Sequence, residues 1–425
     1  MRSVDARLGV QHAVTLNDSL LKAGNTEIDI SGRPIYLVAI GKASAAMTAG
    51  LTDVLGERIT QGIVCGPPHQ ALRPQTWPTF IGGHPLPTEE SILAARSALR
   101  LLANAENDAL IFFLISGGGS AMFELPIDER ITIDELREAN RQLVSCGATI
   151  AEINAVRRTF SAVKGGKLAL AASQTDQITL IVSDTNPGDE ANVASGPTIE
   201  PDVALNAIGV VKRYALEESL PKSIREAIAG YLPEPRSTTA RLRAHYVLLD
   251  NNTALQAAAL RANEMGFVVE VAADINEQEI SSGCDLLLSR AQALWRRNEG
   301  KPVCLISGGE FSCRVPGDGV GGRNLETVLR CALKMKEPSE SPPWAILSAG
   351  TDGIDGNSFA AGATADETTM VRANSAGLDA PNFLARSDSF HFFEQLGDVI
   401  VSGLTGTNVR DVRVVLLGSR ASGTH

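Results

Sequence analysis

The chain has 425 residues, of which 44% are hydrophobic and 4% aromatic, and its formal net charge at pH 7 is −11. This length suggests about two or three domains, and the apolar fraction is that of a folded globular protein. So acidic a chain lacks the diffuse positive field by which proteins bind nucleic acids or anionic membranes. We therefore expect neither as a partner, and any anion must be bound locally by placed cations, backbone N–H groups or a metal.

The cysteines and the apolar segments indicate a location. Six cysteines are scattered without a C-x-x-C pair, which favours neither a disulfide framework nor a zinc site. The first residues, MRSVDARLGVQHAV, contain no apolar core of a secretory signal. The longest strongly apolar run, ALIFFLI at 109–115, is too short to span a bilayer. These features predict a cytoplasmic protein.

Short apolar runs alternate with amphipathic stretches along the chain. The runs predict strands at 34–40, 62–65, 109–115, 177–183, 245–250, 267–272, 302–306, 344–349, 398–403 and 412–417. The amphipathic stretches predict helices at 90–103, 134–149, 204–216, 253–265, 277–297 and 324–336. Because buried parallel strands are continuous Val, Ile and Leu runs with helices between them, we expect an α/β fold with largely parallel sheet. The proline-containing stretch 230–239 predicts a boundary between domains at 1–235 and 236–425.

Glycine-rich loops follow many of the predicted strands, where ligands of parallel α/β sheets bind. They lie at 41–44 (GKAS), 116–121 (SGGGSA), 183–198, 307–324, 349–356 and 402–408, and the pentapeptide LISGG occurs twice, at 114–118 and 305–309. Glycine lets backbone N–H groups approach a phosphate without an intervening Cβ, best just ahead of a helix, as expected for SGGGSA and SGGE. One such loop is an ordinary turn, but six at these positions indicate a ligand site.

Common nucleotide and hydrolase motifs are missing from these loops. SGGGSA matches neither the dinucleotide fingerprint nor a nucleophile elbow around Ser120, because Met122 stands where a small residue is required. Lys42 follows a strand and a glycine, but Ala43 replaces the Ser or Thr of a Walker A loop. Lys42 is a candidate phosphate ligand, and the alternative is a solvated lysine at a helix start. His84 either lines a cleft or packs in a turn.

Acidic residues and one arginine lie in the same loops. The acids are Asp184, Asp189, Glu310, Asp318, Asp352 and Asp355. Carboxylates near a phosphate typically hold Mg²⁺, which takes one or two protein ligands, and one of them can serve as a general base. For each acid the alternative role is to cap a turn. Arg323 follows two glycines and precedes a predicted helix, where its forked guanidinium could clamp a phosphate or a carboxylate.

Nine segments in order resemble the glycerate 2-kinase family, sometimes labelled hydroxypyruvate reductase. They are AIGKASAAM (39–47), GGHPLPTEES (82–91), LISGGGSAMFELP (114–126), INAVRRTFSAVKGGKLA (153–169), VSDTNPGDEANVASGPT (182–198), LISGGE (305–310), GGRNLE (321–326), AGTDGIDG (349–356) and GLTGTNVRDV (403–412). The resemblance implies a Rossmann-like N-terminal α/β domain, a smaller C-terminal α/β domain of the MOFRL type and an active site in the cleft between them. The chain departs from the family at Leu404, where proline is usual.

The resemblance also implies an activity, ATP-dependent phosphorylation of D-glycerate at its C2 hydroxyl with Mg²⁺. Lys42 and Arg323 match the family's catalytic lysine and arginine, and Asp189 or Asp352 would orient the hydroxyl. The nucleotide or substrate contacts expected are Ser116, Gly117, Gly118, Gly119, Ser120, Ser307, Gly308, Gly309, Glu310, Asn324 and Asp352. Asp184 and Asp189 are the expected metal ligands.

Two other functions compete with the kinase. An NAD(P)H-dependent hydroxypyruvate reductase is disfavoured by the missing dinucleotide fingerprint. A non-catalytic nucleotide- or sugar-acid-binding protein would keep the glycines without needing both cations and carboxylates. The sequence leaves open C2 or C3 phosphorylation and a monomer or a homodimer.

Overall fold

The structure is a computed structural model that describes residues 2–68, 77–200, 205–232, 241–335 and 342–419. The chain divides into a first unit, Asp5–Leu249, and a second unit, Met1–Val4 with Asp250–His425. The predicted linker at 230–239 lies mostly outside the described residues. The division falls after Leu249 rather than at 235, because strand β9 pairs with β8 in the first unit. No helix in the described parts of the chain is long and apolar enough to cross a membrane.

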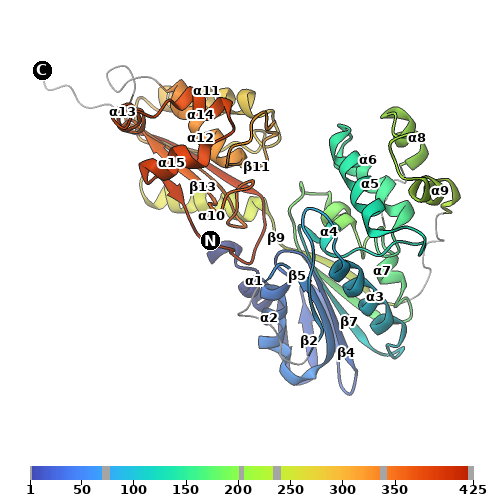
Figure 1. Ribbon diagram of the computed structural model, residues 1–425. Helices are drawn as coiled ribbons and strands as arrows, with labels where there is room; N and C mark the ends of the chain where they lie inside the picture. Colours follow the sequence, from blue (N-terminus) through green and yellow to red (C-terminus); the bar gives the residue numbers. More distant parts are fainter. Residues whose placement is uncertain (1, 69–76, 201–204, 233–240, 336–341, 420–425) are drawn as a thin grey trace, which may run out of the picture. The chain divides into compact units, whose positions relative to one another are not determined.

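The first unit is built on a parallel sheet (Figure 1). Within the described residues its strands, in spatial order, are β6 (Thr79–Ile81), β5 (Ile59–Gly66), β4 (Ile35–Ile40), β7 (Leu110–Ser116), β8 (Asp176–Val182) and β9 (Arg243–Leu249). Strands β4 and β7 are buried along their whole length, as expected where both sheet faces are covered. The chain runs outward from β4 through β5 to β6, and then from β7 through β8 to β9. The switch point between these two directions, where such sheets bind ligands, therefore lies between β4 and β7.

Helices cover both faces of this sheet. The helices of the first unit are α1 (Ala6–Ala13), α2 (Ser44–Leu55), η2 (Gly56–Arg58), α3 (Glu89–Ala103), α4 (Gly119–Met122), α5 (Ile133–Ser145), α6 (Ile150–Phe160), α7 (Lys167–Leu170), η3 (Glu190–Ser195), α8 (Ala207–Arg213) and α9 (Lys222–Gly230). Alternate residues of β4 and β7 pack with α3, α4 and α7, and α2 packs on the other face (Figure 1). Helices α5, α6, α8 and α9 share a core of their own.

A small antiparallel sheet near the start of the first unit escaped the sequence analysis. It consists of β1 (Val14–Asn17), β2 (Leu20–Ala23) and β3 (Thr26–Asp29). These strands are four residues each and carry several polar side chains, so they lack the apolar runs that revealed the other strands.

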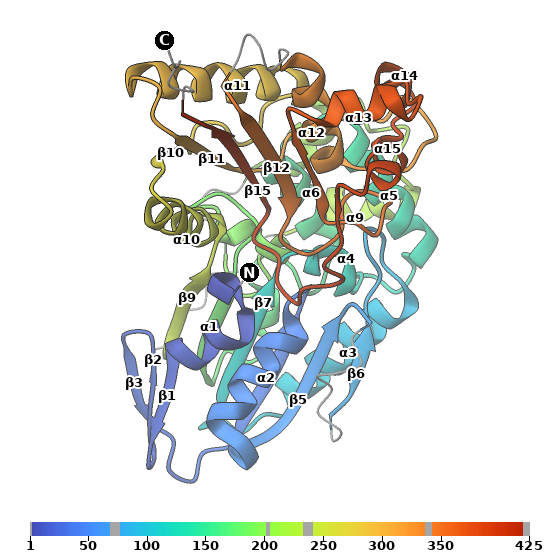
Figure 2. The ribbon, with the colours of Figure 1, turned by 90° about the vertical axis from the view of Figure 1, so that its left-hand side faces the viewer.

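The second unit has a mixed sheet, so the prediction of largely parallel strands is wrong there (Figure 2). In its described part the spatial order is β10 (Val268–Val271), β11 (Val303–Gly309), β15 (Asp411–Leu417), β12 (Trp344–Gly350), β13 (Gly362–Asp366) and β14 (Val399–Ile400). Strand β15 inserts between β11 and β12 and runs antiparallel to both. An apolar run shows that a strand is buried but not which way it runs, which is why the sequence did not reveal this.

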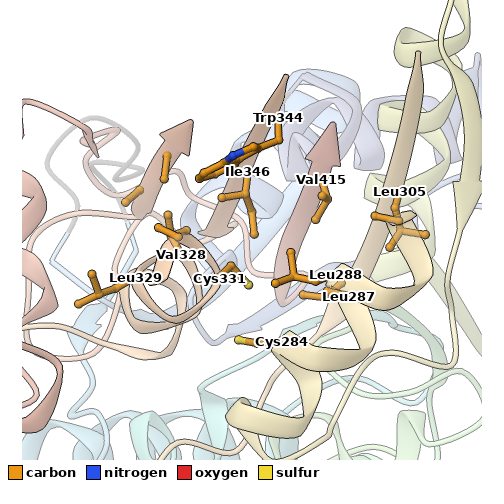
Figure 3. Packing of buried hydrophobic residues seen from close by; sticks show 14 of the residues in the cluster. Cys284, Leu287, Leu288, Leu305, Val328, Leu329, Cys331, Trp344, Ile346 and Val415 are labelled. Carbon is orange, nitrogen blue, oxygen red and sulfur yellow. The ribbon is translucent and has the colours of Figure 1, made fainter. Parts of the chain in front are cut away.

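The faces of the mixed sheet are covered by helices of unequal number. The helices are η1 (Arg2–Val4), α10 (Asn251–Glu264), α11 (Ile280–Arg297), α12 (Arg323–Lys334), α13 (Thr369–Ser375), α14 (Ala380–Ala385) and α15 (Ser389–Leu396). Leu305, Ile346 and Val415 face α11 and α12 in the larger core (Figure 3). The alternate residues Ile306 and Val414 face α10, as the period of two in a strand requires.

Several glycine-rich loops lie at one end of the strands of the mixed sheet, and we call this end the loop-bearing edge. The carboxyl ends of β11 and β12 both lie there, and Gly309 and Gly350 both pair with Asp411, the first residue of β15. The loop at 402–408 therefore leads into a strand at this edge instead of leaving one. Helix α12 begins at Arg323, after the long loop from β11.

Candidate active site

In the first unit, the loops after β4 and β7 are held together at the switch point. The Lys42 amide donates to the Gly117 carbonyl at 2.9 Å. Ser116 is fully buried, and its hydroxyl accepts from the Ala43 amide at 3.0 Å and donates to the Ile40 carbonyl at 3.1 Å. The Ser116 side chain thus links the two loops and fixes the position from which Lys42 projects.

Lys42, the predicted lysine, lies beside the glycine-rich loop at 116–121, which we call the first corner. Gly118 has a φ of 79°, which favours glycine, and a Cβ built there would lie 3.1 Å from Lys42 Cγ and 3.4 Å from His84 Cδ2. Lys42 and the exposed His84 therefore both lie beside Gly118. His84, for which the sequence left a cleft and a turn as alternatives, lies at the predicted site. Helix α4, which follows this corner, is a single turn, so exposed N–H groups matter here more than a helix dipole.

The loop after β8 is tied to the same corner by a chain of side-chain hydrogen bonds. The hydroxyls of Ser120 and Ser195 lie 2.8 Å apart, and Ser195 donates to Asn154 Oδ1 at 2.8 Å. Asn154 in turn donates to Asn192 Oδ1 at 3.1 Å. The hydroxyl of Ser120 thus contacts the loop that carries the predicted metal ligands.

The two predicted metal ligands differ in their surroundings. Asp184 is half-buried just after β8, whereas Asp189 is exposed and precedes η3. The Asp189 carbonyl accepts from the Asn192 amide at 2.8 Å and from Thr185 Oγ1 at 3.2 Å, which shapes the loop. Across the described residues no group of three or more His, Cys, Asp or Glu side chains is arranged to hold a metal. A magnesium ion bound mainly by phosphates and water needs only one or two protein ligands.

In the second unit, the second copy of LISGG is covered by the chain itself. A Cβ on Gly308 would lie 1.8 Å from Asn251 Oδ1, and one on Gly309 would lie 2.5 Å from the Asn276 carbonyl. The Gly309 amide donates to Asn251 Oδ1 at 3.0 Å. These glycines therefore have a packing role. The expectation that SGGE opens a helix is wrong, because no helix follows Gly309 before α12.

Arg323 is held at this edge by two carboxylates. Its Nε and Nη2 donate to the two oxygens of Asp411 at 2.6 and 3.1 Å, and Nη2 also lies 2.8 Å from Glu310 Oε1. Asp411 is 1% exposed, whereas Arg323 and Glu310 are half-buried. Burial alone lowers the pKa of Arg323, but the charges of Asp411 and Glu310 outweigh this and raise it. Asp411 fixes the guanidinium from inside the protein, and Glu310 contacts it at the accessible side.

Ser307, predicted to contact nucleotide, supports a second arginine. Arg413 is 1% exposed, donates from Nε to Ser307 Oγ at 3.1 Å and lies over the Phe311 ring at 3.7 Å. Burial lowers its pKa to about 10. The guanidinium of Arg413 also lies 4.0 Å from Asp411, so two arginines share one buried carboxylate.

The remaining predicted residues organise the start of α12. Asp355 is buried and accepts from the amides of Asn324 and Leu325 at 3.1 and 2.8 Å, so it caps the helix. Asn324 is also buried, and its Oδ1 accepts from Ser348 Oγ at 2.6 Å. Asp352 accepts from the Ile354 amide at 3.2 Å in the loop after β12. Asn324 and Asp355 thus position Arg323 through the helix that it begins.

Comparison with known proteins decides the family. Residues 1–229 match the model of a domain of unknown function called DUF4147, and residues 303–411 match the MOFRL family. A protein of Pyrococcus horikoshii named glycerate 2-kinase is 31% identical over 432 residues, covering 100% of this chain and 96% of its own. The chain belongs to the glycerate 2-kinase family.

Other members of the glycerate 2-kinase family agree in fold and differ in name. The crystal structure of glycerate kinase from Thermotoga maritima matches with a TM-score of 0.77 and 32% identity, over 91% of this chain and 92% of that one. A protein of Agrobacterium vitis that carries the name of a hydroxypyruvate reductase is 35% identical over 90% of this chain and 87% of its own. The predicted family, the α/β fold class and the assignment as a kinase are confirmed.

Several groups that position the predicted site residues of this family member were not predicted from its sequence. Asp411 is the most important, and its signal was an acid at the start of a strand that is apolar from Val414 onward, in VRDVRVVLL. Arg413, two residues on, lies on the same side of β15. Asn251 gave no signal, since it lies in no glycine-rich loop, and Asn154 lies in a segment of the family resemblance but outside those loops.

Proposed function

We propose that the chain is an ATP-dependent kinase that phosphorylates D-glycerate at the C2 hydroxyl. Support comes from the likeness to proteins named glycerate 2-kinase over most of their length. It comes also from Lys42 at the switch point of the first sheet and Arg323 at the loop-bearing edge of the second. Both are cations at positions where α/β sheets bind ligands.

The proposed roles follow from the chemistry of phosphoryl transfer. The transition state is loose and spreads charge over the transferred group, so the protein mainly positions the reactants and neutralises that charge. We assign this neutralisation to Lys42 and Arg323. Asp189 is our candidate for orienting the glycerate hydroxyl, with Asp352 as the alternative.

A magnesium ion fits the carboxylates of the loop after β8. Asp184 and Asp189 supply the oxygen ligands that this ion prefers, and Asp189 is exposed. Bound there, Mg²⁺ would neutralise charge on the terminal phosphates. Ser120 would keep the loop in place through its contact with Ser195.

Glu310 marks where a phosphate would meet Arg323. Its carboxylate lies 2.8 Å from Arg323 Nη2 and is more accessible than the buried Asp411. We propose that a phosphate oxygen takes the place of Glu310 against Arg323, while Asp411 keeps its two hydrogen bonds. The two hydrogen bonds from Arg323 to Asp411 would then fix the orientation of the planar guanidinium toward the phosphate.

The test is an assay of ADP formation from D-glycerate, ATP and Mg²⁺, with NMR of the product to locate the phosphate. We expect ADP to form and the phosphate to be on C2. A phosphate on C3 would overturn the position of transfer only. Oxidation of NADH with hydroxypyruvate, without ADP formation from glycerate, would favour the reductase whose name one relative carries.

A cytoplasmic location and a monomeric or homodimeric state are further parts of this proposal. Gel filtration with light scattering would measure the oligomeric state.

A further inference from the structure

The second unit contains a cavity of about 350 Å³ that Arg323 and Asp355 help to line, and no role assigned above fills its interior. Its walls include Phe311, Val315, Asn357 and Ser389, together with the backbone of the glycines at 319, 321, 322 and 356. All of these residues belong to the second unit. The volume is at the lower end of the roughly 300–1,000 Å³ typical of small-molecule sites.

The charges around this cavity exclude a polyanion from its interior. Of the described residues that line it, Arg323 alone carries a full positive charge, and Glu326 and Asp355 are buried acids. The Glu326 carboxylate is paired with Arg330 at 2.7 Å. A triphosphate inside would lie against these two acids, and their ionised forms would repel it. The interior therefore suits an uncharged group.

The size and polar groups of the cavity fit a nucleoside better than glycerate. A three-carbon acid would leave most of the volume empty and would place its carboxylate among acids. Asn357 Oδ1 accepts from the Gly321 amide at 2.8 Å and its Nδ2 donates to the Gly319 carbonyl at 3.2 Å. The amide retains one N–H and one lone pair in this arrangement, which is the pattern that a purine edge requires.

We propose that this cavity holds the nucleoside of the phosphoryl donor, with the phosphates leaving it past Arg323. The proposal rests on the proposed kinase function. It gives Arg323 a second role, since the same guanidinium that is anchored by Asp411 would mark the boundary between the uncharged and the anionic parts of the nucleotide.

The test fills the cavity from its rim. Val315 is 71% exposed, so Val315→Trp places an indole at the opening without disturbing the core. Val371→Trp is the matched control, because Val371 is 53% exposed on α13 of the same unit and lies outside the cavity lining. Calorimetry on the full chain would measure binding of ADP and of inorganic tripolyphosphate, which has the phosphates but no nucleoside. Steady-state kinetics would give the KM for ATP and for D-glycerate.

We expect Val315→Trp to weaken ADP binding and raise the KM for ATP by about tenfold or more, which corresponds to about 1.4 kcal/mol. Tripolyphosphate binding and the KM for D-glycerate should stay within about twofold, and Val371→Trp should match the wild type in all four. Unchanged ADP affinity, or equal weakening of ADP and tripolyphosphate, would overturn the nucleoside assignment. A raised KM for glycerate alone would assign the cavity to the acid. If tripolyphosphate does not bind the wild type, the two KM values decide.

Failure of the kinase function itself has a different signature. The wild type would then form no ADP from glycerate and ATP, whatever residue stands at position 315. Asn357→Ala is a second variant, because Asn357 is exposed and its loss leaves the core unchanged. It should weaken ADP but not tripolyphosphate.

Discussion

The two copies of LISGG end strands in different environments. The first copy leads into the first corner, and the second copy ends at Gly308 and Gly309, which we call the second corner. The first ends a strand of a parallel sheet at its switch point, and Gly118 lies beside the side chains of Lys42 and His84. The second ends a strand of a mixed sheet, and Gly308 and Gly309 lie under Asn251 and Asn276. One corner presents its glycines to a cation, and the other uses them for close packing.

A glycine-rich loop therefore has two possible physical roles, and its amino-acid sequence does not distinguish between them. A missing Cβ makes room either for a ligand or for another part of the chain. At the second corner the group suited to phosphate is a side chain that arrives from elsewhere, Arg323 from α12, and it is held by Asp411 from β15. The following predictions test this difference.

The largest effect is expected from removing the two cations. Lys42→Ala and Arg323→Ala should each lower kcat by about 10²–10³, as loss of one charge-stabilising donor typically does. Steady-state ADP formation measures this. Near-full turnover in both variants would refute the assignment of either corner to phosphoryl transfer.

Arg323→Ala also allows a sharper version of this test. Added guanidinium should restore part of the activity, because Asp411 still offers two carboxylate oxygens to hold it. In an Arg323→Ala, Asp411→Asn double variant that restoration should be lost. Equal restoration in both backgrounds would show that Asp411 does not anchor the guanidinium, and circular dichroism would check that the double variant is folded.

Asp355, which caps α12, should also give the protein a pH-dependent stability. Burial raises the pKa of Asp355 from 3.8 to about 7, against the opposing effect of hydrogen bonds from Leu325 and Asn324. The folded state therefore binds a proton that the unfolded state releases, so this contribution is fully present below about pH 4 and is lost as the pH rises through 7. Wild-type Tm should fall more than that of Asp355→Asn between pH 5.5 and 8. Parallel changes in the two proteins would contradict the shifted pKa.

Alanine substitutions at the two corners should separate packing from chemistry. Gly308→Ala places a Cβ 1.8 Å from Asn251 Oδ1 and should destabilise by about 1–3 kcal/mol. Adding Asn251→Ala should relieve that clash, at the expense of the bonds that Asn251 makes. Gly118→Ala should cost about 1–2 kcal/mol through its φ of 79° and should act mainly on kcat, by displacing Lys42. Thermal unfolding and kcat of the variants decide whether the corners differ as described.

The smallest effect is expected from Ser120→Ala, which removes one bond from the chain through Ser195 to Asn154. A loss of about 1 kcal/mol is typical for one such bond. The exposed Ser145 is a matched control, since its hydroxyl bonds only within α5. Denaturant unfolding of Ser120→Ala and Ser145→Ala measures the difference in the free energy of unfolding. Equal values would mean that the hydrogen bonds from Ser120 through Ser195 to Asn154 contribute nothing to stability.

Local patterns predicted the strands and the loops that carry the candidate cations. The unbroken apolar runs of β4 and β7 predicted strands that are buried on both faces. The glycines after these strands predicted places where the backbone comes close to another group. Both signals lie within a few residues of the feature they describe. That is why Lys42 and the first corner could be located without a structure.

Features that depend on distant partners were beyond the sequence. Asp411 meets Arg323 across 88 residues of chain, and nothing near either residue specifies that meeting. The direction of β15 is set by its neighbours, so the parallel sheet predicted for the second unit was wrong. The hydroxyls of Ser116 and Ser307, predicted as ligand contacts, hydrogen-bond with Ala43 and Arg413, which their glycine-rich surroundings did not suggest.

The insertion of β15 between β11 and β12 has a consequence for biosynthesis. Every residue up to Leu249 can emerge from the ribosome and complete the first sheet while the second still lacks its central strand. Until residue 417 follows, β11 and β12 present unpaired edges to other nascent chains. The second half of the polypeptide is therefore where we expect a chaperone to be needed during translation.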